Sequence, residues 1–470
     1  MTTSGGAVTA HDVADGDDRD LQDDRYVVVS TDGHVGPSVK DQLRPYCEAA
    51  HLEDFDRFVE EMTGAGLLSW RSSESRDGDE NWTMGVKPKA RKLASDEEAA
   101  EFGKVAGFRN PDQLDRRFLQ RSYEASLVPG LQDSDARLAD MDRAGVAACI
   151  IFHGGLNGQS IPFSTTGLIS WGHTRYNHLE PVGVRIYNRW LADFVSQAPA
   201  RHFGIAHIPI SDPVACVREV EWAAENGLSG INLPAPRGDF PMYNDPVWEP
   251  LWAACQETGL SLNTHGGGGE HYPYEGPGAQ AMYMMETAWR TRRGVWVMIL
   301  GGTFARYPGL KLVLTEQWID WAPQVMRDMD GLFDGPNGIS LREALGTPPS
   351  DHFRQHCYFG ASFLSNGEAK FAIEHDLVAN TMWGDDYPHP EGTWPHTRES
   401  MAHTFCDIDP KHVAQLLGDV AIDVYDLDRA KLRDVANRIG PSVADLSERR
   451  DPPAGETAGL YAFRSEGNFT

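Results

Sequence analysis

The chain has 470 residues, of which 41% are hydrophobic and 24% are charged, and its formal net charge is −27. This composition is typical of a globular protein with a large core, and it excludes the fibrous and disordered classes. An acidic surface repels phosphate backbones, which proteins bind through Lys and Arg, so we expect no nucleic-acid partner.

The sequence carries no signal for export or for membrane insertion. Its first residues lack a basic region followed by an apolar one, and no apolar run reaches the roughly 18 residues that span a bilayer. The 6 cysteines are scattered and form no C-x-x-C pair, which argues against a disulfide framework or a cysteine zinc site. We therefore expect a cytoplasmic protein without a membrane partner.

Runs of apolar, β-branched residues recur along the chain. Residues 1–24 are rich in Asp and poor in core-forming residues, and we expect them to be a disordered acidic tail. Strand-like runs then begin at Arg25, Val146, His202, Leu228, Leu260, Leu310, His356 and Thr381. Helix-like stretches lie between most of them, such as Val214–Asn226 and Val247–Thr258, each followed by a glycine. Strands that alternate with helices predict an α/β fold, and these predict a closed (β/α)8 TIM barrel.

The alternation of strands and helices is interrupted once, after the first strand. The segment that follows contains a long polar stretch, residues 70–104, that does not suit a barrel core. We predict a barrel domain over residues 25–428 with an inserted subdomain at about 37–134, beside the active face. Residues 429–470 are predicted to be a C-terminal extension.

Residues of metal-ligand type follow several predicted strands. They are Asp32 and His34 after the first, His153 after the second, His265 after the fifth, Glu316 after the sixth, and Asp386 and His389 after the eighth. The carboxyl ends of barrel strands meet at one face, where the chemistry of such barrels takes place. Alternate residues of an extended chain point the same way, so Asp32 and His34 share a side. This mixture of imidazoles and carboxylates predicts a site for a divalent metal such as Zn, Mn or Fe.

Each of these residues also has a structural interpretation. A single His after a strand is most often a structural group, and Asp at a strand–helix junction usually caps the helix. His153 suits packing beneath the inserted subdomain, and His389 suits a loop that two prolines already stiffen. The metal hypothesis rests on the convergence of several ligand-type residues at one face, which independent structural roles rarely produce.

Several motifs carry a resemblance to a known family. They are DGHVGP from Asp32, RLADMDRAGV from Arg137, THGG from Thr264, GGTFARYPGLKLVLTE from Gly301, WGDDYPHPEGTWP from Trp383 and LLGDVAIDVYDLD from Leu416. Together they resemble the amidohydrolase-related family, the branch of the amidohydrolase superfamily that includes aminocarboxymuconate-semialdehyde decarboxylase and γ-resorcylate decarboxylase. The resemblance implies a metal-dependent TIM-barrel enzyme whose metal positions fall on Asp32, His34, His265 and Asp386.

The sequence departs from this family at two places. Many relatives have His or Glu at the position of Asp32, and the decarboxylases have a catalytic His where this chain has Glu316. The open roles of Glu316 therefore include those of a metal ligand and of an anchor for its loop. We expect the metal to polarise a substrate oxygen or to activate water, and the candidates for proton transfer are Asp386, Glu316, His153 and His389.

The leading functional hypothesis is hydrolysis or non-oxidative decarboxylation of a small organic compound, either a carboxylate or a cyclic or aromatic molecule. The alternative is a non-haem iron monooxygenase with one or two Fe that hydroxylates a small apolar metabolite, because carboxylate-rich sites also suit di-iron centres. A catalytically inactive barrel is a third hypothesis, which the converging ligand-type residues disfavour. We expect a small-molecule substrate and a homo-oligomer.

Overall fold

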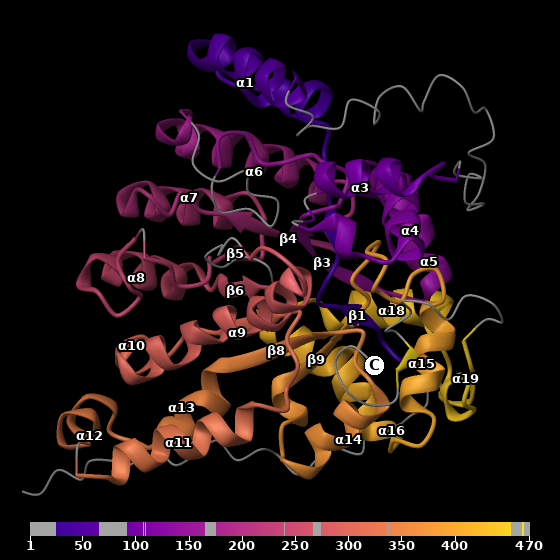
Figure 1. Cartoon of the computed structure of the whole chain (residues 1–470). Coiled ribbons are helices and arrows are strands. Elements are labelled where there is room, and N and C mark those ends of the chain that lie inside the picture. The colour runs from indigo at the N-terminus through magenta and orange to yellow at the C-terminus, as the bar shows by residue number, and fades with distance from the viewer. Residues whose placement is uncertain are drawn as a thin grey trace, which may run out of the picture.

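The structure is a computed structural model that describes residues 25–64, 92–106, 108, 110–164, 175–238, 240–266, 274–336, 338–452 and 463–464. Parallel strands occupy its centre and helices surround them (Figure 1). The predicted acidic tail, residues 1–24, lies outside the described residues.

The strands lie where the apolar runs predict them. They are β1 Val29–Ser30, β2 His34–Val35, β3 Ala148–His153, β4 His202–His207, β5 Gly230–Asn232, β6 Ser261–His265, β7 Leu312–Thr315, β8 Cys357–Ser362 and β9 Thr381–Gly384. Neighbours in the sheet follow chain order from β3 to β9, and every pairing is parallel. Both β1 and β2 pair with β3, so they are two parts of the first barrel strand.

Backbone hydrogen bonds close the barrel between its first and last strands. The amide of Thr31 donates to the carbonyl of Trp383 at 3.0 Å, and the amide of Asp386 donates to the carbonyl of Asp32 at 3.0 Å. The amide of His34 reaches the carbonyl of Tyr387 at 2.7 Å. The predicted (β/α)8 barrel is thereby confirmed, and the loops after its first and last strands lie side by side.

The helices lie outside the strands. They are α1 Leu52–Gly64, α3 Asp96–Val105, α4 Arg116–Ser126, α5 Ser134–Ala144, α6 Glu180–Ser196, α7 Pro213–Glu225, α8 Glu249–Thr258, α9 Ala279–Leu300, α10 Thr303–Arg306, α11 Ala322–Asp334, α12 Ile339–Leu345, α13 Pro349–His356, α14 Asn366–Glu374, α15 Thr397–Phe405, α16 Pro410–Ala414, α17 Val420–Val424, α18 Arg429–Ile439 and α19 Val443–Ser447. Local signals set their ends: the Asp212 carboxylate caps α7, and Gly259 ends α8 at φ 75°.

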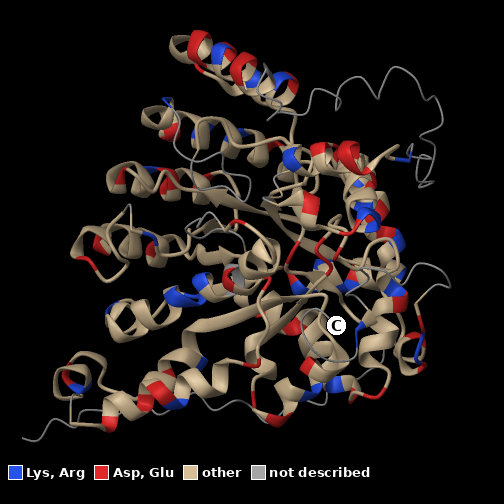
Figure 2. Cartoon of the chain, in the orientation of Figure 1, with Lys and Arg blue, Asp and Glu red and all other residues tan. Residues whose placement is uncertain are grey.

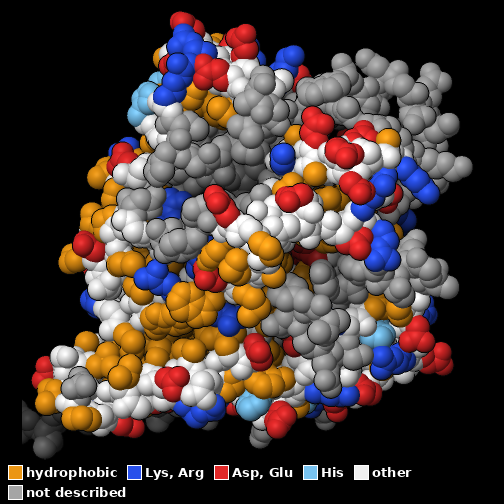
Figure 3. All heavy atoms as spheres, in the orientation of Figure 1, with side chains coloured by type: hydrophobic (Ala, Val, Ile, Leu, Met, Phe, Trp, Pro, Cys, Tyr) orange, Lys and Arg blue, Asp and Glu red, His pale blue; other side chains and the backbone are white. Residues whose placement is uncertain are grey.

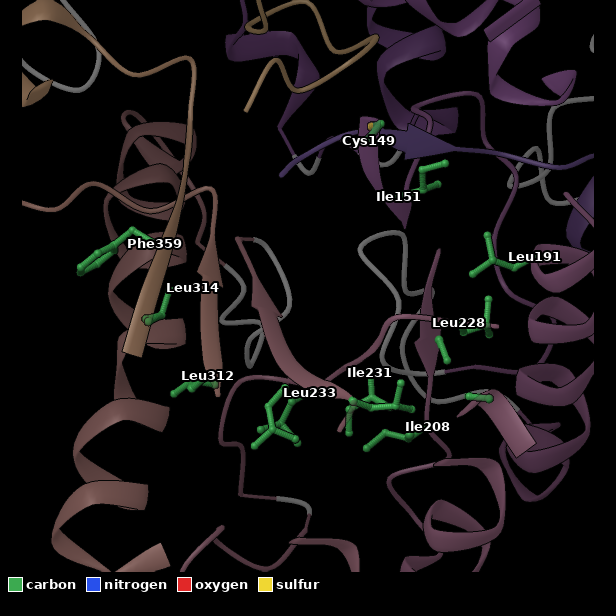
Figure 4. Close-up of a cluster of buried hydrophobic side chains, with 14 of the residues drawn as sticks. Cys149, Ile151, Leu191, Ile208, Leu228, Ile231, Leu233, Leu312, Leu314 and Phe359 are labelled. Atoms are coloured by element: carbon green, nitrogen blue, oxygen red, sulfur yellow. The ribbon is translucent and has the colours of Figure 1, made fainter. Parts of the chain in front are cut away.

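Alternate residues of several strands contribute to two apolar cores. Ile150, Ile205 and Val313 belong to a cluster that also includes Val29 and fills the inside of the barrel. The residues between them face the helices, as the close-up of Ile151, Leu312, Leu314 and Phe359 illustrates (Figure 4). Burial on both faces fixes the register of the strands, because a shift of one residue would exchange the two sets of side chains.

The described part of residues 37–134 contacts the segment that follows β6. The Gln113 side chain donates to the carbonyl of Gly276 at 3.0 Å and accepts from the amide of Gln280 at 3.1 Å. Helices α1, α3 and α4 belong to this region. We propose that it is the inserted subdomain beside the active face, as the sequence predicts.

Helix α18, in the described part of residues 429–470, packs on the apolar cluster inside the barrel. In α18, Leu432, Val435 and Ala436 join the apolar cluster inside the barrel. The amide of Tyr26, before β1, donates to the carbonyl of Pro441 at 2.9 Å. We propose that this C-terminal extension is an integral part of the barrel's core.

Charged residues lie mainly on the peripheral helices and loops, whereas the central strands carry few of them (Figure 2). Among the described helices, none is both long enough and apolar enough to cross a membrane.

Hydrophobic side chains gather on one face over α9 (Figure 3), where Met285 is 70% exposed and Trp289 is 54% exposed.

Candidate metal centre

Asp32 and two histidines form the first half of the site, at the carboxyl end of the barrel. Asp32 lies in the short gap between β1 and β2, His34 opens β2, and His265 is the last residue of β6. The Nε2 atoms of His34 and His265 each lie 3.2 Å from Asp32 Oδ1. All three side chains are buried, and one nitrogen or oxygen of each lies within 4.8 Å of the others.

Asp386 and His389, after β9, form the second half. Asp386 Oδ1 lies 3.1 Å from His34 Nε2 and 3.0 Å from His389 Nδ1. The rings of His34 and His389 are stacked, with centroids 3.9 Å apart. The structure therefore brings together the four residues at which the family resemblance places a metal, with His389 beside them.

Backbone carbonyls fix the tautomer of each histidine. His34 Nδ1 lies 3.2 Å from the carbonyl of His153, and His265 Nδ1 lies 2.9 Å from the carbonyl of Gly266. His389 Nε2 lies 2.7 Å from the carbonyl of Gly154. Because a carbonyl only accepts, these nitrogens carry the proton, and the opposite nitrogen of each neutral ring presents a lone pair to the carboxylates. This is the arrangement that metal-binding histidines adopt.

Several atoms that face the centre of the cluster are buried and have no hydrogen-bond partner among the described residues apart from the close contacts that they make with one another. They are His34 Nε2, His389 Nδ1 and both carboxylate oxygens of Asp386. Buried polar atoms without partners are costly, and buried charges are normally paired or bound to metal. The donor set of imidazole nitrogen and carboxylate oxygen fits a divalent cation, so the residues present suit the metal that the resemblance implies.

The electrostatics of the cluster also favour a metal site. Burial raises the pKa of Asp32, but His265 and His34 outweigh this effect and hold the pKa well below its usual range. Burial lowers the pKa of His265, but Asp32 dominates and raises it to about 9. Burial also lowers the pKa of His389, but Asp386 dominates and raises it to about 10. Without a metal, these imidazoles hold protons that balance the buried carboxylates.

Two further carboxylates border the cluster. Glu316 follows β7, its Oε2 lies 3.6 Å from His265 Nδ1, and its side chain is 26% exposed. Glu391 lies in the loop after β9, and an oxygen of each of Glu316, Asp386 and Glu391 lies within 4.8 Å of the others. Burial raises the pKa of Glu316 to about 8 and that of Glu391 to about 7.

The backbone is strained where two of these carboxylates stand. Glu316 has φ 57° and Asp386 has φ 52°, in the left-handed region that favours glycine. Such a conformation costs on the order of 1–3 kcal/mol for other residues, and it clusters at functional sites. Gly266 also packs so closely on Glu316 that a Cβ atom there would collide with Oε2. The fold thus holds these carboxylates in place at a cost in stability.

Neighbouring polar groups support the cluster from outside. Ser362 Oγ donates to Asp32 Oδ2, and the buried Arg137 donates to the carbonyl of His34 at 2.7 Å. Asp385 faces away from the cluster: its Oδ1 accepts from Ser30 Oγ at 2.6 Å and from the amide of Tyr387 at 3.3 Å. Its role is structural, although no helix begins directly after it.

His153 contributes its backbone more clearly than its ring. Its carbonyl accepts from His34, while its Nε2 lies 3.0 Å from the carbonyl of Gln159. The ring packs edge to face against Tyr187, with centroids 5.2 Å apart, and burial lowers its pKa to about 3. Its assignment to proton transfer therefore stays a prediction.

Sequence reasoning missed Glu391, Ser362 and His207. Glu391 had a signal, since it lies close to Asp386 and His389 in the same loop, and His207 had another, since it ends β4. Burial lowers the pKa of His207 well below its usual range, and its ring lies 6.0 Å from that of His153. Ser362 is the last residue of β8. A serine is neither acidic nor an imidazole, so its residue type does not mark it as part of a metal site.

Comparisons with known proteins agree with this geometry. The family model described as Amidohydrolase matches residues 171–427, more than half of the chain. The structure is similar to 5-carboxyvanillate decarboxylase LigW from Sphingomonas paucimobilis, with 20% identity, a TM-score of 0.55, and coverage of 85% of this chain and 99% of that one. It is also similar to the amidohydrolase map2389c from Mycobacterium avium subsp. paratuberculosis K-10, with 16% identity, a TM-score of 0.57, and coverage of 85% and 99%.

A third similar structure is 5-carboxyvanillate decarboxylase LigW2 from Novosphingobium aromaticivorans DSM 12444, solved with bound manganese. It shares 16% identity and a TM-score of 0.58, with 86% of this chain and 98% of that chain covered. At these sequence identities the solved structures support the fold alone. The match to the family model shows the family to which the chain belongs. The chain belongs to the amidohydrolase family of enzymes.

Proposed function

We propose that this chain catalyses metal-dependent, non-oxidative decarboxylation of a small aromatic carboxylate. The observation that carries the proposal is the buried cluster of Asp32, His34, His265 and Asp386, in which imidazole nitrogens lie 3.1 to 3.2 Å from carboxylate oxygens. The structurally similar 5-carboxyvanillate decarboxylases support the substrate class.

A divalent cation held by these four residues would supply positive charge that binds the substrate's carboxylate and stabilises charge developing next to it. We propose Mn²⁺ as the first choice, since LigW2 was solved with manganese, and Zn²⁺ and Fe²⁺ as the alternatives.

The chain's own residues would supply the proton. The bond between the ring carbon and the carboxyl group breaks, CO2 leaves, and the electron pair left on the ring carbon takes the Nδ1 proton of His389 in its protonated, imidazolium form. Asp386 Oδ1, 3.0 Å away, holds the His389 ring in place and favours its reprotonation from water. One proton is consumed for each CO2 released, and no oxidant takes part.

The test is incubation of the Mn²⁺-loaded enzyme with 5-carboxyvanillate and dihydroxybenzoates in D2O. We expect CO2 release without O2 uptake, and one deuterium at the ring carbon that carried the carboxyl group. His389→Gln should lower kcat by about 10²- to 10⁴-fold, because a positioned proton donor contributes that much.

The matched control is His412→Gln in α16, outside the cluster, for which we expect unchanged turnover. O2 uptake in proportion to product would contradict the decarboxylase proposal, as would cleavage of amides or lactones without CO2. A His389→Gln variant with full turnover and full deuterium incorporation would remove His389 from the proton-transfer step.

Metal binding should depend on pH in a defined direction. His265 has a pKa of about 9 in the metal-free protein, so below that pH a metal must displace its proton. The apparent affinity for Mn²⁺ should therefore rise by up to about tenfold per pH unit from pH 6 and level off near pH 9. Isothermal titration calorimetry in buffers of different ionisation enthalpy measures both the affinity for Mn²⁺ and the number of protons released. An affinity for Mn²⁺ that does not change between pH 6 and pH 8 would contradict this prediction.

The oxygenase alternative has no support from the comparisons, and we do not propose it. A homo-oligomer remains our proposal, and the exposed apolar residues of α9, Met282, Met285 and Trp289, lie on one helical stripe that would suit self-association. The cytoplasmic location and the lack of a nucleic-acid partner stay predictions.

A further inference from the structure

We infer that His207 is a specificity-determining residue whose imidazole hydrogen-bonds a hydroxyl group on the substrate's ring, away from the group that the metal binds. The inference rests on the proposed function in one respect, since it takes the substrate to be an aromatic carboxylate. It gives a role to a buried histidine that is not among the proposed metal ligands.

His207 lies at the same end of the barrel as the metal centre. It is the last residue of β4, and it alternates with Phe203 and Ile205, whose side chains join the apolar cluster inside the barrel. Because alternate residues of a strand point to the same face, the His207 side chain points into the barrel, above that cluster. Strands β4, β5 and β6 are successive neighbours in the sheet, and β6 ends at His265. The His207 imidazole therefore lies close to the metal centre without belonging to it.

The backbone of His207 is held by a buried side chain from α6. The Asn188 side chain accepts from the amide of His207 at 2.9 Å and donates to its carbonyl at 2.8 Å. The Asn188 side chain also donates to the Glu219 carboxylate in α7 at 2.8 Å. These bonds hold the end of β4 against two helices, so the imidazole stands on a rigid element, as a specificity residue requires.

Two aromatic rings set the plane of the imidazole. The ring centroids of His207 and Tyr187 lie 5.4 Å apart with the rings at 89°, and those of His207 and His153 lie 6.0 Å apart with the rings at 90°. Edge-to-face contacts of this kind are favourable. The imidazole is therefore oriented before a ligand arrives, which lowers the entropy cost of binding.

The imidazole of His207 lacks the hydrogen bond that other buried histidines make. Its residue bonds through the backbone alone, and neither ring nitrogen has a hydrogen-bond partner in the part of the chain that the structure describes. By contrast, a ring nitrogen of every other buried histidine in that part lies 2.7 to 3.4 Å from a protein oxygen; these are His34, His153, His202, His265, His352, His356, His389 and His403. A buried polar group without a partner is costly, so the exception indicates a ligand.

The charge of the imidazole decides which kind of group it binds. Burial lowers the pKa of His207 well below its usual range, and His153 and His265 act in the same direction. The ring is therefore neutral at neutral pH, with one N–H donor and one acceptor nitrogen. A hydroxyl group both donates and accepts, so it can pair with either nitrogen, whereas a carboxylate only accepts and binds the metal instead. We therefore assign His207 to a ring hydroxyl.

The experiment is isothermal titration calorimetry of the Mn²⁺-loaded full chain with benzoate, 3-hydroxybenzoate and 4-hydroxybenzoate. In the two hydroxybenzoates the hydroxyl is too far from the carboxylate for one cation to bind both, so a gain in affinity reports a contact with the protein. We expect at least one of them to bind about tenfold tighter than benzoate, the usual effect of one hydrogen bond.

Variants of His207 assign this preference to one side chain. His207→Phe keeps a ring against Tyr187 but has no nitrogen, so it should bind all three ligands with equal affinity. His207→Gln keeps a donor and an acceptor and should retain part of the preference. The matched control is His202→Phe, a buried histidine at the opposite end of β4, which should keep the whole preference.

Circular dichroism shows whether each variant is folded, and His207→Ala replaces His207→Phe if the latter does not fold. Equal affinity of the wild-type chain for the three ligands overturns the inference, as does a folded His207→Phe variant that still prefers a hydroxybenzoate. Release of CO2 from an aromatic carboxylate by a chain without this preference would sink the role of His207 alone. A preference that depends on His207, in a chain that releases no CO2, would sink only the proposed reaction.

Discussion

Asp386→Asn is expected to abolish turnover and to lower the affinity for Mn²⁺ by more than about 100-fold. Outer partners of metal ligands already contribute about 10- to 100-fold in affinity, and Asp386 lies inside the ligand set. Its Oδ1 contacts both His34 and His389, and one of its oxygens lies within 4.8 Å of an oxygen of Glu316 and of Glu391. The Asn side chain carries no negative charge, and its NH2 group replaces one of the two carboxylate oxygens. An NH2 group does not bind a cation.

The adjacent residue provides a matched control. Asp385 is the same residue type and is also buried, but its carboxylate accepts from Ser30 and from the amide of Tyr387 instead of facing the cluster. Asp385→Asn keeps an oxygen for both bonds, so this variant should retain its metal and most of its activity. Elemental analysis, Mn²⁺ dialysis and circular dichroism on both variants distinguish loss of the site from loss of the fold.

Equal metal content in the two variants would contradict our placement of the centre. His265→Ala offers an independent check, since it removes an imidazole whose Nε2 lies 3.2 Å from Asp32 Oδ1. If Asp386→Asn and His265→Ala both retained metal, the cluster would be a network of structural ion pairs.

Most of the barrel could be predicted from sequence because its strands are short apolar runs bounded by polar turns. Ile150 and Ile151, for example, are both buried, one inside the barrel and one beneath the helices. A strand buried on both faces has no polar alternation, and the run itself becomes the signal. The break of the first strand into β1 and β2 had no such signal, because the residues between them turn inward to the metal centre.

The ligand residues were predictable because barrel topology brings strand ends together, whatever their separation in sequence. Asp32 and Asp386 are far apart along the chain but adjacent across the closure of the barrel. The carbonyls of His153, Gly154 and Gly266, which set the histidine tautomers, could not be predicted because a backbone group leaves no trace in residue type. Glu391 was missed because the path of its loop depends on contacts such as the bond from Thr393 to Asp385.

Arg464→Met is expected to destabilise the folded chain by about 3–5 kcal/mol, the usual cost of leaving one member of a buried ion pair alone. The Arg464 guanidinium lies 2.8 Å from the Glu368 carboxylate, and their side chains are 1% and 10% exposed. Arg464 also donates to the carbonyl of Phe363 at 2.9 Å. Urea unfolding followed by tryptophan fluorescence measures the change in the free energy of unfolding.

The control for this prediction is Arg449→Met, also in the C-terminal extension. Its side chain is 52% exposed and its Nε lies 3.9 Å from Asp451, so its loss should change stability by less than about 1 kcal/mol. Adding Glu368→Gln to Arg464→Met should recover part of the loss, since no unpaired charge then stays buried. If Arg464→Met were as stable as Arg449→Met, the extension would contribute nothing to stability at this contact.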